Sequence, residues 1–324
     1  MRKRTYRILI ILAVVVVALS VALAIGLHYR QEPSSDSTAS NTTQQPSDNM
    51  PSWEQHDSTP SENQWQQPEG STFEIHFFDV GEGDSALVEC DGHYMLIDGG
   101  NPGSSSFLYS YLKKHEIDYL DYIVCSHAHT DHVGGLAGAL NYATVGVAYA
   151  PVTEYDSRAF NGFLKYLSAQ SKEIVIPSPG DIITLGNATV TFMGPIDMTL
   201  AEQNMNNSSI ILRVEYGYTS FLFTGDAEIE EELSLITSGF ELQSTLIKVG
   251  HHGSYTSSSD AFLSSVDPDY AVISVGEGNE YGHPHDVTLN RLSNVCDSIY
   301  RTDIDGEITC ISDGNTLSFV VSRK

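Results

Sequence analysis

Positive charge is scarce in this sequence. Lys and Arg number 16 against 42 Asp and Glu, which gives a formal net charge of −26 at pH 7. Arg2, Lys3, Arg4 and Arg7 all precede residue 8, and no cluster of Lys or Arg follows. Proteins that grip nucleic acid electrostatically need such clusters. The composition therefore argues against a general electrostatic grip on nucleic acid, and an anionic substrate needs another source of positive charge, such as bound metal.

Cysteine and internal repetition are also lacking. Cys90, Cys125, Cys296 and Cys310 show no C-x-x-C spacing, so cysteine says little about function. Cys296 and Cys310 flank an expected hairpin with its turn at 303–306, and either a disulfide between them or two buried free thiols fits this pattern. No repeat of fixed period is present, which gives no sign of a solenoid or propeller.

One long apolar run contrasts with this polar composition. Ile8–Leu27 carries no charge and has the length that a helix needs to cross a bilayer, about 20 residues. Because basic residues precede it, the positive-inside rule predicts a single-pass cell-membrane protein with the rest of the chain extracellular. The alternative is a cleaved signal peptide and a secreted protein, since 22–24 reads Ala-Leu-Ala, a small-x-small pattern.

Residues 31–71 are mostly Ser, Thr, Gln, Asn and Pro. Such a segment cannot bury enough apolar surface to fold, so a disordered linker is predicted. Trp53 and Trp65 are interpreted as solvated linker aromatics, with contact to a cell wall as the alternative. The sequence thus divides into an anchor or signal segment (1–30), a linker (31–71) and a folded domain (72–324).

The domain alternates short strand-like runs with helix-like runs, which predicts an α/β fold of mixed sheets with helices outside. Helices are expected near 106–115, from 131 onward, at 158–169 and at 227–237. Strands are expected at 73–80, 85–90, 94–98, 122–126, 145–150, 174–177, 181–185, 188–194, 209–216, 219–226, 244–250, 270–275, 298–302, 307–311 and 317–321.

The loop after the strand "YIVC" is rich in metal-binding side chains. It reads "SHAHTDHVGG" over 126–135 and holds three of the chain's 12 histidines. His127 and His129 can point to one side of an extended loop, and Asp131 and His132 follow where a helix opens. Histidine and carboxylate at this spacing suit zinc or a similar divalent ion. The two pairs predict two ions, one for each pair.

Two later strands end in side chains of the same kind. Asp226 ends "FLFTGD" and can bridge two ions, or cap the helix that follows. The segment "IKVGHHGS" ends its strand at His251 and His252, one of which can complete the second ion. We expect His252 to be the ligand and His251 to contact the substrate or its leaving group, because adjacent residues of an extended segment point opposite ways.

These motifs, taken together and in order, resemble the metallo-β-lactamase fold from about Phe73 to Val321. The runs "FFDVGEGDSALVE", "MLIDGG", "SHAHTDHVGGL", "NNSSIILRVEYGYTSFLFTGD", "KVGHHGS" and "GNEYGHPH" resemble the extracellular hydrolase domain of ComEC-type competence proteins. The multi-span pore region of those proteins has no counterpart in this chain. The resemblance implies an αβ/βα sandwich of two mixed sheets with outer helices and a site at one edge.

The resemblance also implies roles for individual residues. Zinc is the expected metal and manganese the alternative. Its ligands would be His127 and His129 on the first ion, Asp131, His132 and His252 on the second, and Asp226 between them. Asp131 would thereby be catalytic, and His251, or His283 in "YGHPH", would protonate the leaving group. His283 is equally a turn residue before Pro284.

Supporting roles are less specific. Asp98 is either an orienting partner of a metal ligand or a turn former. Asp79 and Asp84 are expected to shape the turn in "DVGEGDS", and Lys248 to lie on the polar face of its strand.

One departure from the family pattern concerns the first ion. Many members supply a further histidine to it from the segment before the "TGD" strand, which here reads "EQNMNNSS". Asn206, Asn207 or Ser208 can stand in, through water or as contacts to substrate. We therefore expect the first ion to bind more weakly than the second.

The sequence favours an extracellular, metal-dependent phosphodiesterase or nuclease of ComEC type, linked to DNA uptake or processing. Two ions would activate water and neutralise phosphoryl oxygens. The alternative is an esterase that acts on phosphocholine or teichoic-acid groups of the cell wall, since an acidic domain gains little from long nucleic acid. β-Lactam hydrolysis and a non-catalytic binding module are weaker alternatives.

Overall fold

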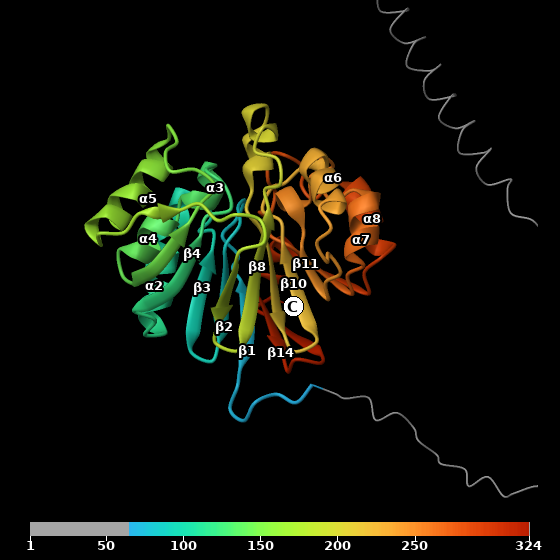
Figure 1. Ribbon diagram of the computed structural model, residues 1–324, viewed down its shortest axis with the longest axis horizontal. Coiled ribbons are helices and arrows are strands. Elements are labelled where there is room, and N and C mark those ends of the chain that lie inside the picture. Colours follow the sequence, from blue (N-terminus) through green and yellow to red (C-terminus); the bar gives the residue numbers. More distant parts are fainter. Residues whose placement is uncertain (1–64, 324) are drawn as a thin grey trace, which may run out of the picture. The chain divides into compact units, whose positions relative to one another are not determined.

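The computed structural model describes residues 65–323. Within them two β-sheets pack face to face, with α2–α5 outside one sheet and α6–α8 outside the other (Figure 1). The expected sandwich of two mixed sheets with outer helices is confirmed.

The first sheet has eight strands in the order β15-β14-β1-β2-β3-β4-β5-β6. Its β15–β3 half is antiparallel, and β3 to β6 run parallel. The strands are β1 (Phe73–Phe77), β2 (Ala86–Cys90), β3 (His93–Ile97), β4 (Tyr119–Val124), β5 (Thr144–Tyr149), β6 (Ile174–Val175), β14 (Ile308–Ser312) and β15 (Leu317–Val321).

The second sheet has seven strands in the order β13-β12-β11-β10-β9-β8-β7. Strands β10 to β13 run parallel, and β7 to β10 are antiparallel. The strands are β7 (Ile182–Leu185), β8 (Ala188–Gly194), β9 (Ile211–Tyr216), β10 (Thr219–Phe223), β11 (Leu246–Lys248), β12 (Tyr270–Ile273) and β13 (Ser298–Arg301).

The helices lie between these strands in the chain. The α-helices are α2 (Ser105–Lys114), α3 (Thr130–Val133), α4 (Leu136–Leu140), α5 (Arg158–Ala169), α6 (Ile229–Thr237), α7 (Asp260–Val266), α8 (Asp286–Ser293) and α9 (Thr302–Asp305). Short 3-10 turns are η1 (Pro102–Ser104), η2 (Leu200–Glu202), η3 (Met205–Ser208) and η4 (Gly250–Gly253). The expected helix at 158–169 is confirmed to the residue, whereas α7 and α8 were not anticipated.

Three apolar clusters account for this layering. The central cluster lies between the sheets and includes Phe77, Phe192 and Phe221. A second fills the space under α2–α5, and a third the space under α6–α8. Strand β10 is buried at every position, as expected of a strand covered on both faces. The inner strands are thereby fixed, and their loops project from one edge.

The expected hairpin between 298–302 and 307–311 is wrong. Strand β13 pairs in parallel with β12 in the second sheet, while β14 pairs with β1 and β15 in the first. The short helix α9 carries the chain from one sheet to the other. Cys296 and Cys310 do not form a disulfide, and all four cysteines are free thiols.

The expectation of a solvated Trp65 is also wrong. Its ring packs edge-on against Tyr216 at a centroid distance of 5.0 Å and joins the central cluster. No helix within 65–323 is both long and apolar enough to span a bilayer. The predicted anchor, Trp53 and most of the predicted linker lie outside the described residues.

Candidate metal centre

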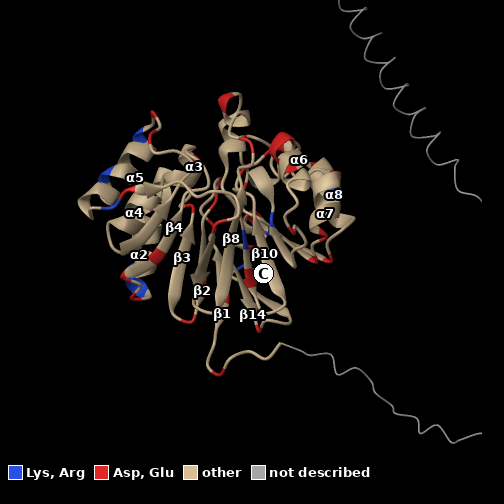
Figure 2. Cartoon of the chain, viewed as in Figure 1, with Lys and Arg blue, Asp and Glu red and all other residues tan. Residues whose placement is uncertain are grey.

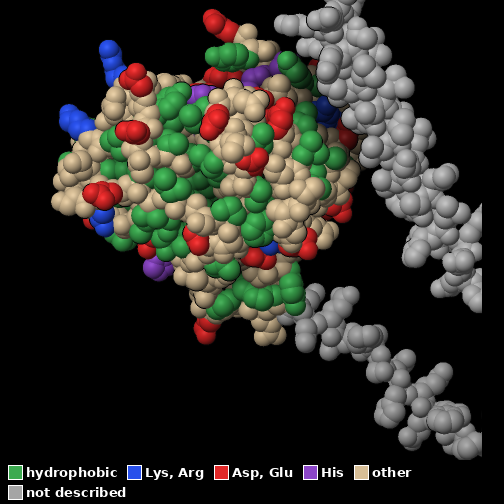
Figure 3. All heavy atoms as spheres, turned by 45° about the horizontal axis from the view of Figure 1, so that its top comes forward, with side chains coloured by type: hydrophobic (Ala, Val, Ile, Leu, Met, Phe, Trp, Pro, Cys, Tyr) green, Lys and Arg blue, Asp and Glu red, His purple; other side chains and the backbone are tan. Residues whose placement is uncertain are grey.

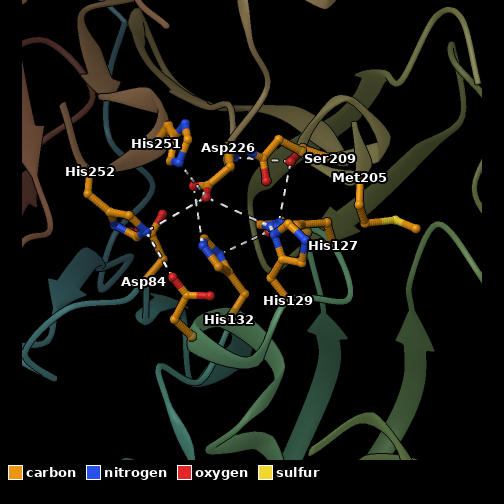
Figure 4. A network of polar contacts seen from close by, with 12 residues as sticks. Asp84, His127, His129, His132, Met205, Ser209, Asp226, His251 and His252 are labelled. Carbon is orange, nitrogen blue, oxygen red and sulfur yellow. Dashed lines mark hydrogen bonds and ion pairs between the residues drawn. The ribbon is translucent and has the colours of Figure 1, made fainter. Parts of the chain in front are cut away.

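The predicted histidine and aspartate ligands converge at one edge of the sandwich (Figure 4). The loop after β4 supplies 127–132, the end of β10 supplies Asp226, and η4 after β11 supplies His251 and His252. All three loops leave the carboxyl ends of strands, where α/β folds place their ligand sites. Figure 3 shows histidine side chains as small patches near the top of the domain and at its lower left. His132, Asp226 and His252 are each 3% exposed or less, so the centre is largely enclosed.

Glycines let the loop after β4 pack tightly. A Cβ on Gly135 would lie 1.9 Å from the Gly99 carbonyl oxygen, so only glycine fits there. Gly225, just after β10, has a φ of 52°. A Cβ there would lie 2.9 Å from both Ser126 Cβ and Ser209 Oγ. The Ile210 amide donates to the Ser126 carbonyl at 2.7 Å and ties the two sheets together beneath the site.

Four side chains form one compact group, which we call site 2: Asp131, His132, Asp226 and His252. Their donor atoms all lie within 4.8 Å of one another. His132 Nε2 is 3.2 Å from Asp226 Oδ1, and His252 Nε2 is 3.4 Å from Asp131 Oδ2 and 3.7 Å from Asp226 Oδ2. All but Asp131 are buried.

His127 and His129, with the shared Asp226, form a second and looser group, which we call site 1. His127 Nε2 lies 3.0 Å from His129 Nδ1 and 3.8 Å from Asp226 Oδ2. Asp226 therefore faces both groups, in the bridging position expected from the sequence. It does not cap α6, which begins at Ile229 with Glu228 at its N-cap.

The donor set of site 2 fits a divalent cation. His132 Nε2, His252 Nε2 and Asp226 Oδ1 are buried, and no hydrogen bond among the described residues satisfies them. Buried polar atoms are ordinarily paired, since leaving them unpaired is costly. A cation bound by all three removes that cost, and nitrogen and carboxylate donors are those that zinc takes.

Electrostatics divide the histidines into two kinds. Burial and the neighbouring His132 hold the pKa of His127 well below its usual range, so its ring is neutral. For His132 and His252, burial favours the neutral ring, but adjacent carboxylates outweigh it. The pKa of His132 is thereby raised well above its ordinary value, and that of His252 to about 10. A metal must displace a proton from each of these two rings.

Two further aspartates stand behind the rings of site 2. Asp98 Oδ2 lies 2.9 Å from His132 Nδ1, and its other oxygen accepts from the Ser126 amide. Asp84 Oδ1 lies 3.1 Å from His252 Nδ1, and its Oδ2 lies 2.7 Å from Lys248 Nζ. The turn-forming reading of Asp84 and the polar-face reading of Lys248 are therefore wrong, because both side chains are buried against the centre.

The segment of His251 and His252 does not have the extended conformation expected from the sequence. Both residues adopt left-handed backbone angles, with φ of 48° and 52°. Such angles cost a non-glycine residue roughly 1–2 kcal/mol. The turn directs His252 into site 2, while His251 Nε2 lies 3.8 Å from Asp226 Oδ2 and its Nδ1 faces Thr256 and Glu228.

The segment that lacks the family histidine forms η3 beside site 1. Asn207 Oδ1 accepts from the Glu228 amide, and Ser208 Oγ donates to the Met205 carbonyl. Asn206 lies next to His129, and its Oδ1 is buried with no hydrogen-bond partner among the described residues. Ser209, which sequence reasoning passed over, lies with its Oγ 3.4 Å from His127 Nδ1 and accepts from the Asp226 amide.

His283 lies beside the two histidines of η4. Its ring centroid is 5.6 Å from that of His251, and its Nδ1 is 3.2 Å from Glu82 Oε1. Glu82 also accepts from the Gly276 amide and so joins the loop after β1 to the loop after β12. Nothing in the sequence pairs Glu82 with a histidine 201 residues away.

Comparison with known proteins agrees with this geometry. The model of the metallo-beta-lactamase superfamily matches residues 78–277, which include every residue of sites 1 and 2. The chain belongs to the metallo-beta-lactamase superfamily. Its placement in this superfamily confirms the resemblance drawn from the motifs.

Two curated proteins are similar to this chain over most of its length. ComE operon protein 3 of Bacillus subtilis is 28% identical over 253 residues, 72% of this chain and 32% of that protein. Competence protein ComA of Neisseria gonorrhoeae is 30% identical over 236 residues, 72% of this chain and 31% of that protein. This chain thus spans about a third of the length of these curated relatives.

Among solved structures, the metallo-beta-lactamase fold protein YhfI from Bacillus subtilis overlaps 76% of this chain and 100% of its own. Its TM-score is 0.49 and its sequence identity 13%.

Proposed function

We propose that this protein is a metal-dependent phosphodiesterase that cleaves nucleic acid outside the cell, in DNA uptake or processing. The observation that carries the proposal is the convergence of sites 1 and 2 on the shared Asp226 carboxylate. The competence proteins among its relatives support nucleic acid as the substrate. The run Ile8–Leu27 would anchor the chain and leave the centre on the extracellular side.

The residues of the two sites would hold two divalent ions. Such a pair activates water and neutralises the charge that builds up on phosphoryl oxygens. Zinc suits the histidine and carboxylate donors, with manganese as the alternative metal. Site 1 offers only two histidines, so Asn206 Oδ1, a buried oxygen without a hydrogen bond, is our proposed further donor there.

His251 and His283 would handle the proton that the leaving oxygen needs. Each has a carboxylate at Nδ1: Glu228 Oε1 at 3.4 Å from His251, and Glu82 Oε1 at 3.2 Å from His283. A carboxylate at Nδ1 fixes the ring and leaves Nε2 to hold or give a proton. His251 Nε2 is directed at Asp226, and its side chain is 23% exposed, so substrate can reach it.

The distribution of charge shapes how substrate is held. Figure 2 shows Lys and Arg on α2, on and beside α5, and at a few positions near β10, with no large basic patch. Arg291 and Arg301 pair with Asp260 and Asp303. With few free cations near the site, we expect a shallow dependence of nucleic-acid binding on salt, because each phosphate neutralised by Lys or Arg adds roughly 0.9 to the slope.

The test is hydrolysis by the full chain, purified in detergent and loaded with Zn²⁺ or Mn²⁺. Substrates are plasmid DNA, single-stranded DNA, bis-p-nitrophenyl phosphate, p-nitrophenylphosphocholine and nitrocefin. We expect metal-dependent cleavage of DNA and of bis-p-nitrophenyl phosphate, with loss of activity in chelator. Metal-loaded protein that leaves every phosphodiester intact contradicts the proposal.

A cell-wall phosphoester is the second candidate substrate. The acidic composition favours it, because 42 acidic residues against 16 basic ones disfavour a long polyanion. Cleavage of p-nitrophenylphosphocholine with no cleavage of DNA would select this candidate.

A further inference from the structure

Lys248 is a buried lysine at the end of β11. It is 3% exposed, and its Nζ lies 2.7 Å from Asp84 Oδ2 and donates to the Val249 carbonyl at 3.0 Å. Asp84 is 5% exposed. Removing two charges from water is costly, and replacement of a buried ion pair by apolar side chains is often neutral or stabilising. Stability of the fold therefore does not explain why an ion pair lies here.

The position of Asp84 suggests what the ion pair does. One carboxylate oxygen faces Lys248, and the other lies 3.1 Å from His252 Nδ1. The backbone amide of Asp84 donates to the Asp131 carbonyl at 3.2 Å. Asp84 thus contacts two of the four residues of site 2, one through its side chain and one through its backbone.

Lys248 fixes the plane of that carboxylate. Asp84 has a short side chain whose terminal torsion is broad in the absence of a partner. With Oδ2 held by the ammonium, Oδ1 is directed at His252, whose Nδ1 also lies 3.1 Å from the Ser274 carbonyl. The Ser274 carbonyl accepts from Nδ1, and the negative charge of Asp84 lies at the same distance from that atom. Together they favour a proton on Nδ1 and leave Nε2 toward Asp131 and Asp226.

We propose that Lys248 is a positioning residue for the metal centre: through Asp84 it holds the His252 ring in place and sets the affinity of site 2 for its ion. The inference rests on the proposed metal centre and is independent of the substrate. A purely structural role, in which Lys248 only joins β11 to the turn after β1, is the competing explanation.

Lys248→Met separates the two explanations, because it removes the charge and keeps most of the length. Lys172→Met is the matched control: Lys172 Nζ donates to the Gly146 carbonyl at 2.8 Å, far from the site in the chain. Each full-length variant is titrated with Co²⁺ against a competing chelator, the ligand-field absorption is recorded, and the melting temperature is measured in chelator.

We expect Lys248→Met to weaken the tighter-bound ion roughly 10- to 100-fold, as loss of an outer partner of a metal ligand does. The absorption spectrum of that ion should change, and the weaker ion should be unaffected. Lys172→Met should change neither. Lys248→Arg, which keeps the charge beside Asp84, should recover most of the affinity.

In the Lys248→Met variant the buried carboxylate of Asp84 has lost its ion-pair partner, and the variant can therefore unfold. In that event the double variant Lys248→Met/Asp84→Asn, which buries no unpaired charge, is measured in its place, and the same loss of affinity is expected. Wild-type affinity and spectrum in either variant, whatever the melting temperature, overturn the proposal. Wild-type protein that binds no Co²⁺ would instead reject the metal centre itself.

Discussion

Four of the candidate ligands of sites 1 and 2 come from one six-residue stretch, 127–132. The two sites nevertheless differ in the groups that contact the far side of their histidine rings. The rings of His132 and His252 in site 2 have carboxylates at Nδ1, from Asp98 and Asp84. In site 1, the partners of His127 Nδ1 within residues 65–323 are two hydroxyls, those of Ser126 at 3.2 Å and Ser209 at 3.4 Å.

This difference indicates that two sites with similar ligands can differ in their affinity for a metal ion. A carboxylate behind an imidazole fixes the ring and raises its basicity, and a hydroxyl does so less. Site 2 also gathers four donors within 4.8 Å, whereas site 1 has two histidines and the shared Asp226. We therefore expect site 2 to bind its ion more tightly.

The largest effect is expected where the two sites meet. Asp226→Ala removes the carboxylate that faces both sites. It should reduce hydrolytic activity by more than about 10³-fold and lower the metal content of the protein. Metal analysis and bis-p-nitrophenyl phosphate hydrolysis measure this. Asp118→Ala, at an exposed acidic residue, is the control. Full activity in metal-free Asp226→Ala protein would contradict a metal-dependent mechanism.

Loss of one histidine from each site should separate them. His252→Gln removes a site 2 ligand and should weaken the tighter ion by more than the roughly 10- to 100-fold that loss of an outer partner causes. His127→Gln should release only the weaker ion. Chelator titration of wild-type protein should likewise remove one ion well before the other. Two ions that leave together, with equal affinity, contradict the inequality of the sites.

Changes behind the ligands should give smaller, unequal effects. Asp98→Asn removes the negative charge beside His132 Nδ1 and should weaken ion binding at site 2 roughly 10- to 100-fold. Ser209→Ala removes a neutral neighbour of His127 and should weaken site 1 less than about tenfold. The metal dissociation constants of the two variants test this. Equal losses mean that charge behind the ring does not set the difference.

The smallest effect concerns pH. The pKa of His252 is raised to about 10, so in chelator-treated protein the stability from its protonated ring is full below about pH 6.5 and lost as pH rises toward 10. Bound metal requires the neutral ring and removes this dependence. We expect the melting temperature to fall over that window with chelator but not with metal, and calorimetry in different buffers to detect proton release on binding. A flat melting temperature with chelator contradicts this.

Much of the site could be predicted from the sequence because its signals are local. Alternating patterns locate the strands, and the polar residues that follow them mark the strand ends. Because such ends meet at one edge of a sheet, the sequence predicts that 127–132, Asp226 and His252 lie together there. The choice of His252 over His251 agrees with the structure, though for another reason. The left-handed angles of both residues follow from packing around the turn, which no local pattern reports.

Tertiary structure alone decided the contacts that span the chain. Asp84 and Lys248 read as a turn residue and a strand residue, and only the packing of the two sheets brings them to 2.7 Å. Glu82 reaches His283 in the same way. Trp65 looked like part of a polar linker because its partner, Tyr216, is far away in the sequence. Strands β13 and β14 looked like a hairpin because turn residues do not reveal that the chain changes sheets at α9.

The sequence by itself thus determined the fold class and pointed to the side chains that form the candidate metal centre, since both depend on local periodicity and on which residues follow each strand. Only the tertiary structure decided which side chains lie behind those candidate ligands and how the surroundings of the two sites differ. The physical reason is that burial makes each such contact strong, and burial is a property of the packed sheets rather than of any short stretch of chain.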